Sequence, residues 1–404
     1  MRVSTNEIFR LATNGIVEQQ ATVNQTQLQL SSGKRILQPS DDPTGATQAL
    51  ELKTAISTTQ QYERNADQVR SRLGLEESTL ESVVANMQRV RELVVQANND
   101  SQSNETRQLI AAEVRQSLDA MLQLANTRDA NGEYIFAGFK SQTQPFALDG
   151  AGGATYSGDD GQRFLQISPV RQVPISDSGT AVFRDIANGN GNFRTLDDPT
   201  TNTGTGIIDA GSVTDLGAYV PDDYTITFTD TPTGLEYSIV GATTGVVAAN
   251  VPYVEGADLG IPGIQVNIKG TPGDGDQFFV EPSQRQDIFA TYQALASALE
   301  TDRGSSADLA DFHNAMNRAL VDLDQSLGNV LDVRATIGAR LNSVDAQSNI
   351  NESQLLTLQN TLSGVEDLDY AEAISRFQQQ LVTLQAAQQS FVKIQGLSLF
   401  NFIR

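Results

Sequence analysis

The sequence has 404 residues and a formal net charge of −22. Its length is enough for two or three domains. The acidic balance argues against nucleic-acid binding, because phosphate contacts need clustered lysines and arginines. Cysteine is absent, which excludes disulfides, thiolate metal sites and a cysteine nucleophile. There is no apolar run of about 18 residues, so no transmembrane helix is predicted. Residues 1–20 have no apolar signal-peptide core, and a secreted form would need another export route.

Proline divides the chain into three parts. Ten of the 12 prolines lie between Pro145 and Pro282, and the two ends are nearly free of them. Because proline interrupts helices, this distribution predicts helical ends around a β-rich insert. The predicted fold class is α+β, a long helical coiled-coil rod made by the N- and C-terminal segments with an inserted antiparallel β domain. The predicted parts are an assembly helix and turn (1–43), two halves of the rod (44–145 and 283–365), the outer β insert (146–282) and a C-terminal assembly helix (366–404).

The first segment, residues 1–32, carries a thin apolar stripe with a period of seven. Its members are Phe9, Ile16, Val23 and Leu30. So sparse a stripe predicts a helix that forms only against a partner. A turn around Gly33 follows, and then a stretch in which Ser40, Asp41 or Asp42 can cap a helix that has Pro43 in its first turn.

The next two helices are predicted over about 44–98 and 105–126, joined by a polar turn as an antiparallel hairpin. The first of them has an apolar seam that only Glu76 interrupts. The seam residues assigned to the rod core are Leu73, Leu80, Val83, Met87, Val90 and Val94. After the hairpin, the Asn131-Gly132 turn dipeptide predicts a short strand that ends near residue 139.

The insert alternates apolar and polar residues over 224–229, 236–239, 264–268 and 277–280. This period of two predicts antiparallel strands. Residues 146–282 contain 18 acidic and 5 basic residues, so 13 of the 22 net negative charges lie in the insert. Such a charge favours a solvated domain that faces outward.

After a predicted helix over 283–300, the tail carries a heptad seam from Met316 to Val365. The rod-core residues in it are Leu320, Leu323, Leu327, Val330, Ile337, Leu341 and Val344. The register fails after Val365, and Asp369 with Glu372 predicts the N-cap of a second helix. The stripe of that helix consists of Ile374, Phe377, Leu381, Leu384, Phe391, Leu397 and Phe400.

Each apolar stripe needs a partner. We expect the seam of 316–344 to pack on the 44–126 hairpin. We expect the stripe after Ile374 to pack mainly on other subunits, together with the stripe of residues 1–32, because the new register separates it from the first seam. Ordering the backbone of a helix costs about 1–2 kcal/mol per residue. Burying one apolar side chain of a stripe stabilises the helix by about 1.5–3 kcal/mol, so a helix with a single stripe is close to balance. Residues 1–40 and 366–404 are therefore predicted to be mobile in the monomer and to fold on assembly.

No catalytic, cofactor or metal site is predicted. His313 is the single histidine, and a lone histidine on a helix is most often structural. Asp159, Asp160, Asp274 and Asp276 lie beside glycines and suggest calcium, but without EF-hand spacing turn chemistry is the better interpretation. The pairs Asp197-Asp198 and Asp222-Asp223 are interpreted as solvated carboxylates and not as a catalytic pair.

Several segments resemble the flagellar hook–filament junction proteins, the hook-associated protein 3 family of flagellin-like proteins. The most specific is residues 124–127 followed by 131–139, in which Tyr134-Ile135-Phe136-Ala137-Gly138 leads into Pro145-Phe146. The other similar segments are 1–5, 32–36, 38–43, 156–162, 337–341 and 399–404. The resemblance covers both ends of the chain and is weak over about 165–270.

This resemblance implies a structural protein of the bacterial flagellum, outside the cell, between the hook-associated ring and the filament. It implies a ring-like assembly of copies of the chain, with hook-associated protein 1 on the hook side and flagellin on the filament side. It also implies export through the flagellar type III apparatus and a chaperone that holds the C-terminal helix. No cofactor, nucleic acid or membrane partner is implied. The alternatives are a flagellin subunit and a secreted coiled-coil adhesin, and no constellation of residues supports an enzyme.

Overall fold

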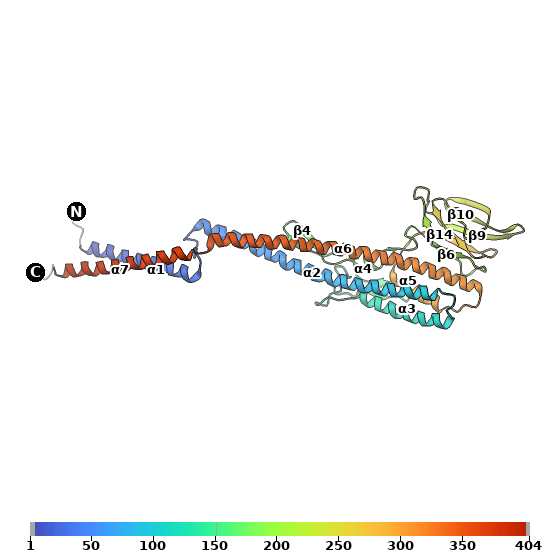
Figure 1. Ribbon diagram of the computed structural model, residues 1–404, viewed down its shortest axis with the longest axis horizontal. Helices are drawn as coiled ribbons and strands as arrows, with labels where there is room; N and C mark the ends of the chain where they lie inside the picture. The colour runs from blue at the N-terminus through green and yellow to red at the C-terminus, as the bar shows by residue number, and fades with distance from the viewer. Residues whose placement is uncertain (1–4, 151, 401–404) are drawn as a thin grey trace. The chain divides into compact units, whose positions relative to one another are not determined.

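The computed structural model describes the backbone of residues 5–150 and 152–400, and the side chains of residues 7, 9–150 and 152–393 (Figure 1). The chain divides into two compact units. The terminal unit contains the residues up to Arg64 and those from Ala346, and the central unit contains Asn65–Asp345. Two long helices, α2 (Pro43–Ala97) and α6 (Ser306–Glu366), contribute residues to both units. None of the helices in the described ranges has the length and hydropathy that crossing a bilayer requires.

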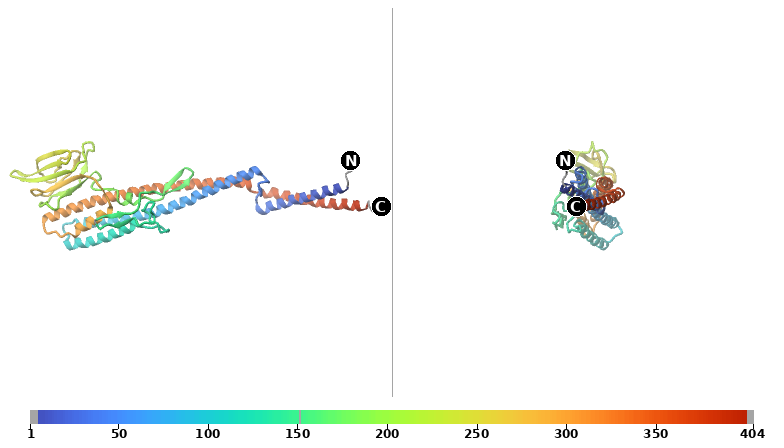
Figure 2. Two further views of the ribbon diagram at one scale, coloured as in Figure 1. Left: turned by 180° about the vertical axis from the view of Figure 1, so that it is seen from behind. Right: turned by 90° about the vertical axis from the view of Figure 1, so that its left-hand side faces the viewer.

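The terminal unit contains the two outermost helices, α1 (Thr5–Ser32) and α7 (Tyr370–Phe400), which lie side by side and antiparallel (Figures 1 and 2). The predicted starts of α2 and α7 are confirmed. Asp42 Oδ1 accepts a hydrogen bond from Gly45 N at 2.9 Å, so Asp42 caps α2 with Pro43 directly after it. Asp369 Oδ1 accepts from the backbone N of Glu372 at 3.2 Å and caps α7 at the predicted break.

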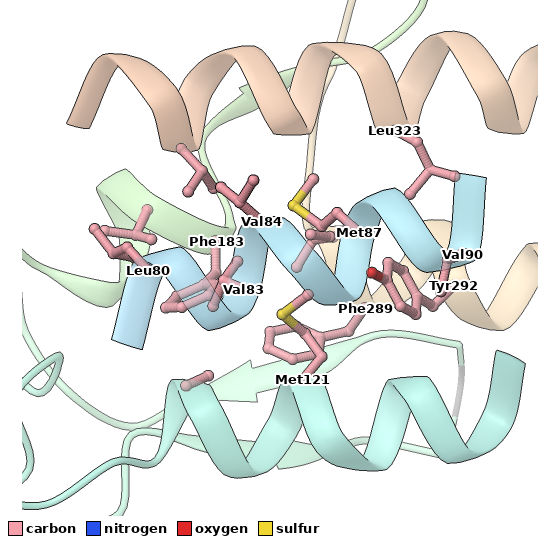
Figure 3. Close-up of a cluster of buried hydrophobic side chains, with 14 of the residues drawn as sticks. Leu80, Val83, Val84, Met87, Val90, Met121, Phe183, Phe289, Tyr292 and Leu323 are labelled. Carbon is pink, nitrogen blue, oxygen red and sulfur yellow. The ribbon is translucent and has the colours of Figure 1, made fainter. Parts of the chain in front are cut away.

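The central unit is built on a bundle of four helices: α2, α3 (Asn104–Ala125), α5 (Ile288–Glu300) and α6. The predicted antiparallel hairpin of α2 and α3 is confirmed by one contact beside the turn and one further along the two helices. Asn86 Nδ2 donates to Ser117 O at 3.1 Å, and Arg107 Nε donates to Ala97 O at 3.3 Å. Figure 3 shows α2 side chains from Leu80 to Val90 enclosed by side chains of the neighbouring helices.

The predicted strand near 131–139 is wrong. Tyr134 makes one isolated bridge with Arg128, and turns follow it. The reason is burial: four successive side chains, from Tyr134 to Ala137, are all buried, whereas a surface strand would bury alternate ones. Gly138 then has a φ of +67°, and a Cβ at this position would lie 2.1 Å from Asp159 O.

The first part of the insert packs on the helices. Side chains between Phe146 and Ile186 belong to the same hydrophobic core as the bundle, including Phe146 and Phe183, which contact Phe289 of α5. The elements of this part are β1 (Phe146–Leu148), β2 (Ala154–Tyr156), β3 (Phe164–Ser168), β4 (Arg171–Pro174), α4 (Gly179–Phe183) and β5 (Ile186–Ala187). A separate hydrophobic core begins at Phe193 and ends at Val280. We call residues 193–282 the β domain.

The β domain contains a five-stranded antiparallel sheet with the order β11-β10-β9-β14-β6. Its strands are β6 (Phe193–Asp197), β9 (Tyr224–Thr231), β10 (Gly234–Gly241), β11 (Gly245–Pro252) and β14 (Gln277–Pro282). The predicted strand 264–268 is instead two short strands, because each half pairs with a different partner. These pairs are β12 (Ile264–Gln265) with β8 (Ser212–Val213), and β13 (Ile268–Lys269) with β7 (Ile207–Ile208).

The β domain lies beside α5 and the first turns of α6, as both side views show (Figures 1 and 2). The chain returns from it through β15 (Arg285–Gln286), which pairs with β5. The predicted helix over 283–300 therefore begins later, at Ile288, because the preceding residues belong to this strand pair. Asp287 caps the helix through a 2.6 Å hydrogen bond from Ala290 N.

Candidate assembly interface

The structure brings the two predicted terminal stripes together within one chain. The rings of Phe9 and Phe391 meet edge to face with centroids 5.9 Å apart. Val23 is buried, and Phe377 is half-buried in α7. The other half-buried members are Ile16, Leu30, Leu381 and Leu384, and Ile374 is 46% exposed. The side chains of Leu397 and Phe400 lie outside the described residues. Burial of these stripes by neighbouring subunits stays a prediction.

The pair of α1 and α7, which we call the terminal pair, also presents apolar side chains that the heptad pattern missed. The aliphatic ones in the described part of the pair that are more than half exposed are Leu11, Val17, Leu28, Val382 and Val392. A groove of about 290 Å³ between the two helices is lined by small residues such as Ala12, Gly15 and Ala387. Large exposed apolar side chains beside a groove are typical of a surface that binds another protein. These residues are recognisable in the sequence as apolar positions, but they do not belong to the predicted stripes of the two terminal helices.

Charged residues hold the turn after α1 and the start of α2 against the end of α6. Glu366 accepts from Lys34 Nζ at 2.7 Å and pairs with Lys53 Nζ at 2.8 Å. Burial acts to raise the pKa of Glu366, but the two lysines outweigh it and the pKa is lowered. Backbone hydrogen bonds join the same two segments, from Arg35 N to Glu366 O and from Leu368 N to Gly33 O. The sequence did not predict this cluster, because its members lie more than 300 residues apart.

All the residues assigned to the rod core lie in or against the core of the central bundle. Leu73, Leu80, Val330 and Ile337 are fully buried, and Leu320, Leu327 and Leu341 are partly buried against them. The remaining members, also buried, are Val83, Met87, Val90, Val94, Leu323 and Val344.

The interruption of this seam, Glu76, is itself buried in the core. Its Oε1 accepts from Asp177 N at 3.0 Å, while its Oε2 has no hydrogen-bond partner among the described residues. Asp177 is in turn held by Arg340 of α6 through two contacts of 2.8 and 2.9 Å. Burial, followed by the charge of Asp177, raises the pKa of Glu76 to about 8. Glu76 therefore joins α2, the segment before α4 and α6.

The carboxylates considered for calcium mostly serve turns. Asp159 Oδ1 accepts from Phe139 N at 2.8 Å and Gly161 N at 2.9 Å, and these hydrogen bonds lower its pKa. Asp276 accepts from the backbone of Thr203, Gly204 and Gly273, and Asp274 accepts from Asp230 N. Within the described ranges, no three His, Asp or Glu side chains are grouped as metal ligands.

The interpretation of the two aspartate pairs as solvated carboxylates is wrong for one member of each, because Asp197 and Asp222 are buried against their hydrogen-bond and ion-pair partners. Asp222 accepts from the backbone of Thr243 and Thr244, which lowers its pKa and closes the turn between β10 and β11. Asp198 accepts from Thr200 N, and Asp197 pairs with Arg318. His313 contacts Asn98 Oδ1 at 2.7 Å and Asp100 Oδ1 at 2.9 Å, which joins α6 to the turn after α2.

Two family models match the ends of the chain: the bacterial flagellin N-terminal helical region over residues 3–141 and the C-terminal helical region over residues 320–403. Flagellar hook-associated protein 3 of Escherichia coli (strain K12) is 27% identical over 402 residues, 99% of either chain. The crystal structure of the flagellar junction protein FlgL from Legionella pneumophila is similar with a TM-score of 0.73 and 34% identity, over 79% of this chain and 100% of that one. Flagellin 1 of Proteus mirabilis is 31% identical over 140 residues, 35% of this chain and 38% of its own length.

Proposed function

Because this chain belongs to the flagellar hook-associated protein 3 family of flagellin-like proteins, we propose that its terminal pair polymerises it into the junction between hook and filament. The protein is a structural component of the bacterial flagellum. Its similarity to hook-associated protein 3 of Escherichia coli extends over 99% of the chain, whereas the similarity to Flagellin 1 of Proteus mirabilis covers 35% of it, so the junction is favoured over the bulk filament.

The observation that carries the proposal is the incomplete burial of the terminal pair. Val382 and Val392 of α7 and Leu11 of α1 are more than half exposed although the two helices already pack on each other. Full burial of one such side chain is worth about 1.5–3 kcal/mol. Packing against neighbouring subunits therefore stabilises the polymer. It also supports the proposed ordering of residues 1–40 and 366–404 on assembly.

The proposed neighbours are other copies of the chain, hook-associated protein 1 toward the hook and flagellin toward the filament. The matched regions include the terminal helices and are shared with flagellins, which supports packing between like surfaces. We further propose export through the flagellar type III apparatus to the outside of the cell. A chaperone at α7 would cover its exposed apolar side chains, including Val382 and Val392, before export.

The test is deletion of the gene in a motile host, followed by complementation. Deletion is expected to leave hooks without filaments and to release flagellin into the medium. The variant Val382→Asp is expected to be exported but to restore few filaments, because a carboxylate on the buried face of a polymer is costly. The matched control Gln385→Asp introduces the same charge at an exposed polar position one turn away, and is expected to restore filaments. Normal filaments with Val382→Asp, or intact filaments after deletion, would contradict the proposal.

A further inference from the structure

The helix α6 has a second functional face. At spacings of three and four residues, Asp311, Asn314, Arg318 and Asp322 form a polar stripe along it. Asn314 is 1% exposed; its Oδ1 accepts from Ile208 N at 2.9 Å, and its Nδ2 donates to Gly206 O at 3.1 Å. These hydrogen bonds attach the β domain to the bundle.

The same stripe brings two carboxyl groups together. Arg318 donates to Asp197 Oδ1 on β6. The side chain of Asp197 is 1% exposed, yet its Oδ2 is buried with no hydrogen-bond donor in the described part of the chain. Asp311 lies one turn before Asn314 on the same face of α6, where the charge of Asp197 acts on its carboxyl group. A proton on Asp311 would supply the donor that Asp197 Oδ2 lacks, whereas two bare carboxylates would repel each other.

The surroundings of Asp311 favour its protonated form. Burial raises the pKa of Asp311 to about 6, and the nearby Asp197 and then Asp308 raise it as well, while Arg318 lowers it. Asp197 faces it from β6, and Asp308 and Arg318 face it from its own helix. An acid of this kind changes its charge near neutral pH.

The interface beside these carboxyls is loosely packed. A cavity of about 340 Å³ lies between the β domain and helices α5 and α6. Alanines at 294, 298, 315 and 319 form part of its wall, and β6 and β7 close the other side. This cavity is partly open, so side chains do not fill the whole interface here, and the polar stripe supplies contacts beside it.

We propose that Asp311 and Asp197 form a proton-dependent latch between the β domain and the helical bundle. When Asp311 carries a proton, the β domain is fixed on α6. When the proton leaves, the carboxylates repel and the β domain moves over the cavity, with the hydrogen bonds of Asn314 as the pivot.

The test measures the distance between the β domain and the bundle as a function of pH. Because the sequence has no cysteine, Val246→Cys on β11 and Leu109→Cys on α3, both strongly exposed, provide two unique spin-label sites in the full chain. Double electron–electron resonance is expected to give a narrow distance distribution at pH 5 and a broad or two-component one at pH 7.5. The midpoint is expected near pH 6, from the pKa of Asp311.

Two variants decide which group is responsible. Asp311→Asn carries a permanent N–H donor, so its distribution is expected to stay narrow at both pH values. The control Asp332→Asn removes the same charge from an exposed position on the same helix and is expected to behave as the unchanged chain. The proposal is overturned if the distribution of the unchanged chain is the same at both pH values. It is also overturned if Asp311→Asn keeps the transition or Asp332→Asn abolishes it.

Discussion

The central bundle and the terminal pair are built from the same heptad repeat, but they bury it to different degrees. In the bundle, α2 is enclosed by three other helices and by the segment around Phe183, so Leu73, Leu80 and Val90 are fully buried. In the terminal pair, α1 has one partner in its chain, and the stripe residues Phe9 and Ile16 stay half-exposed. One partner covers only one sector of a helix. The heptad repeat therefore specifies which face of a helix is apolar, whereas the number of neighbouring helices determines how much of that face is buried.

Two phenylalanines test the comparison directly, and the larger effect belongs to the bundle. Phe289 is fully buried against Phe146 and Phe183. Phe289→Ala is expected to lower the free energy of unfolding by about 3–5 kcal/mol, since it removes apolar contacts and leaves a cavity. Urea unfolding followed by circular dichroism measures the change. Leu109→Ala, at an exposed position of α3, is the control and should cost less than about 0.5 kcal/mol. Equal costs would mean that the bundle core is not close-packed.

The second effect is a pH dependence that belongs to the bundle. The folded protein binds a proton at Glu76 with a pKa of about 8, above the ordinary value of 4.5. The stabilisation from this proton is complete below pH 4.5 and is lost as pH rises through 8. Between these values the free energy of unfolding should fall by about 1.4 kcal/mol per pH unit.

The variant Glu76→Gln keeps the shape of the protonated acid and cannot ionise. The contribution of Glu76 to the pH dependence is therefore expected to be lost, so that the slope between about pH 6 and 8, above the pKa of Asp311, becomes shallow. The stability of the variant should exceed that of the unchanged chain most at the alkaline end. Urea unfolding at several pH values measures both slopes. Parallel slopes for the two proteins would show that Glu76 does not hold the proton.

The smallest effect belongs to the terminal pair. Phe391→Ala removes one edge-to-face contact with Phe9 from a half-buried site, and is expected to cost about 0.5–1.5 kcal/mol of local stability. Hydrogen exchange of the α1 amides near Phe9 measures it in the isolated subunit. The amides of α3 should be unchanged in the same experiment. A loss of stability as large as that caused by Phe289→Ala would mean that the terminal pair already forms a close-packed core within the single chain.

The sequence predicted features that short stretches of chain determine. The break between α6 and α7 was readable because the register fails at Val365 and Asp369 supplies a cap within a few residues. The helical hairpin and the positions of β9, β10 and β14 follow in the same way from local periodicity. The division of residues 264–268 into two short strands could not be predicted, because it depends on pairing with two different strands, β8 and β7.

The sequence failed where a polar residue is buried by distant neighbours. Glu76 looked like a gap in a seam, because its partner segment lies about a hundred residues later. Asn314 and Arg318 lie outside the apolar seam of α6, and no local pattern marked them, because only the fold places the β domain against them. For the candidate interface, the stripe residues could be predicted, but the exposure of Leu11 or Val382 depends on which sector α1 and α7 turn toward each other.

The strand pair of β5 and β15 closes the β domain at its base. Ala187 faces Arg285 in this pair, and hydrogen bonds between Asn188 and Gln284 continue it by one residue. The two chain segments that connect the β domain to the bundle are therefore joined to each other by this strand pair. Insertions or deletions within the β domain change its size, while the strand pair keeps the distance between the flanking segments of the bundle the same. The exposed part of the β domain can therefore change in length during evolution without a change in the hydrophobic core of the helical bundle.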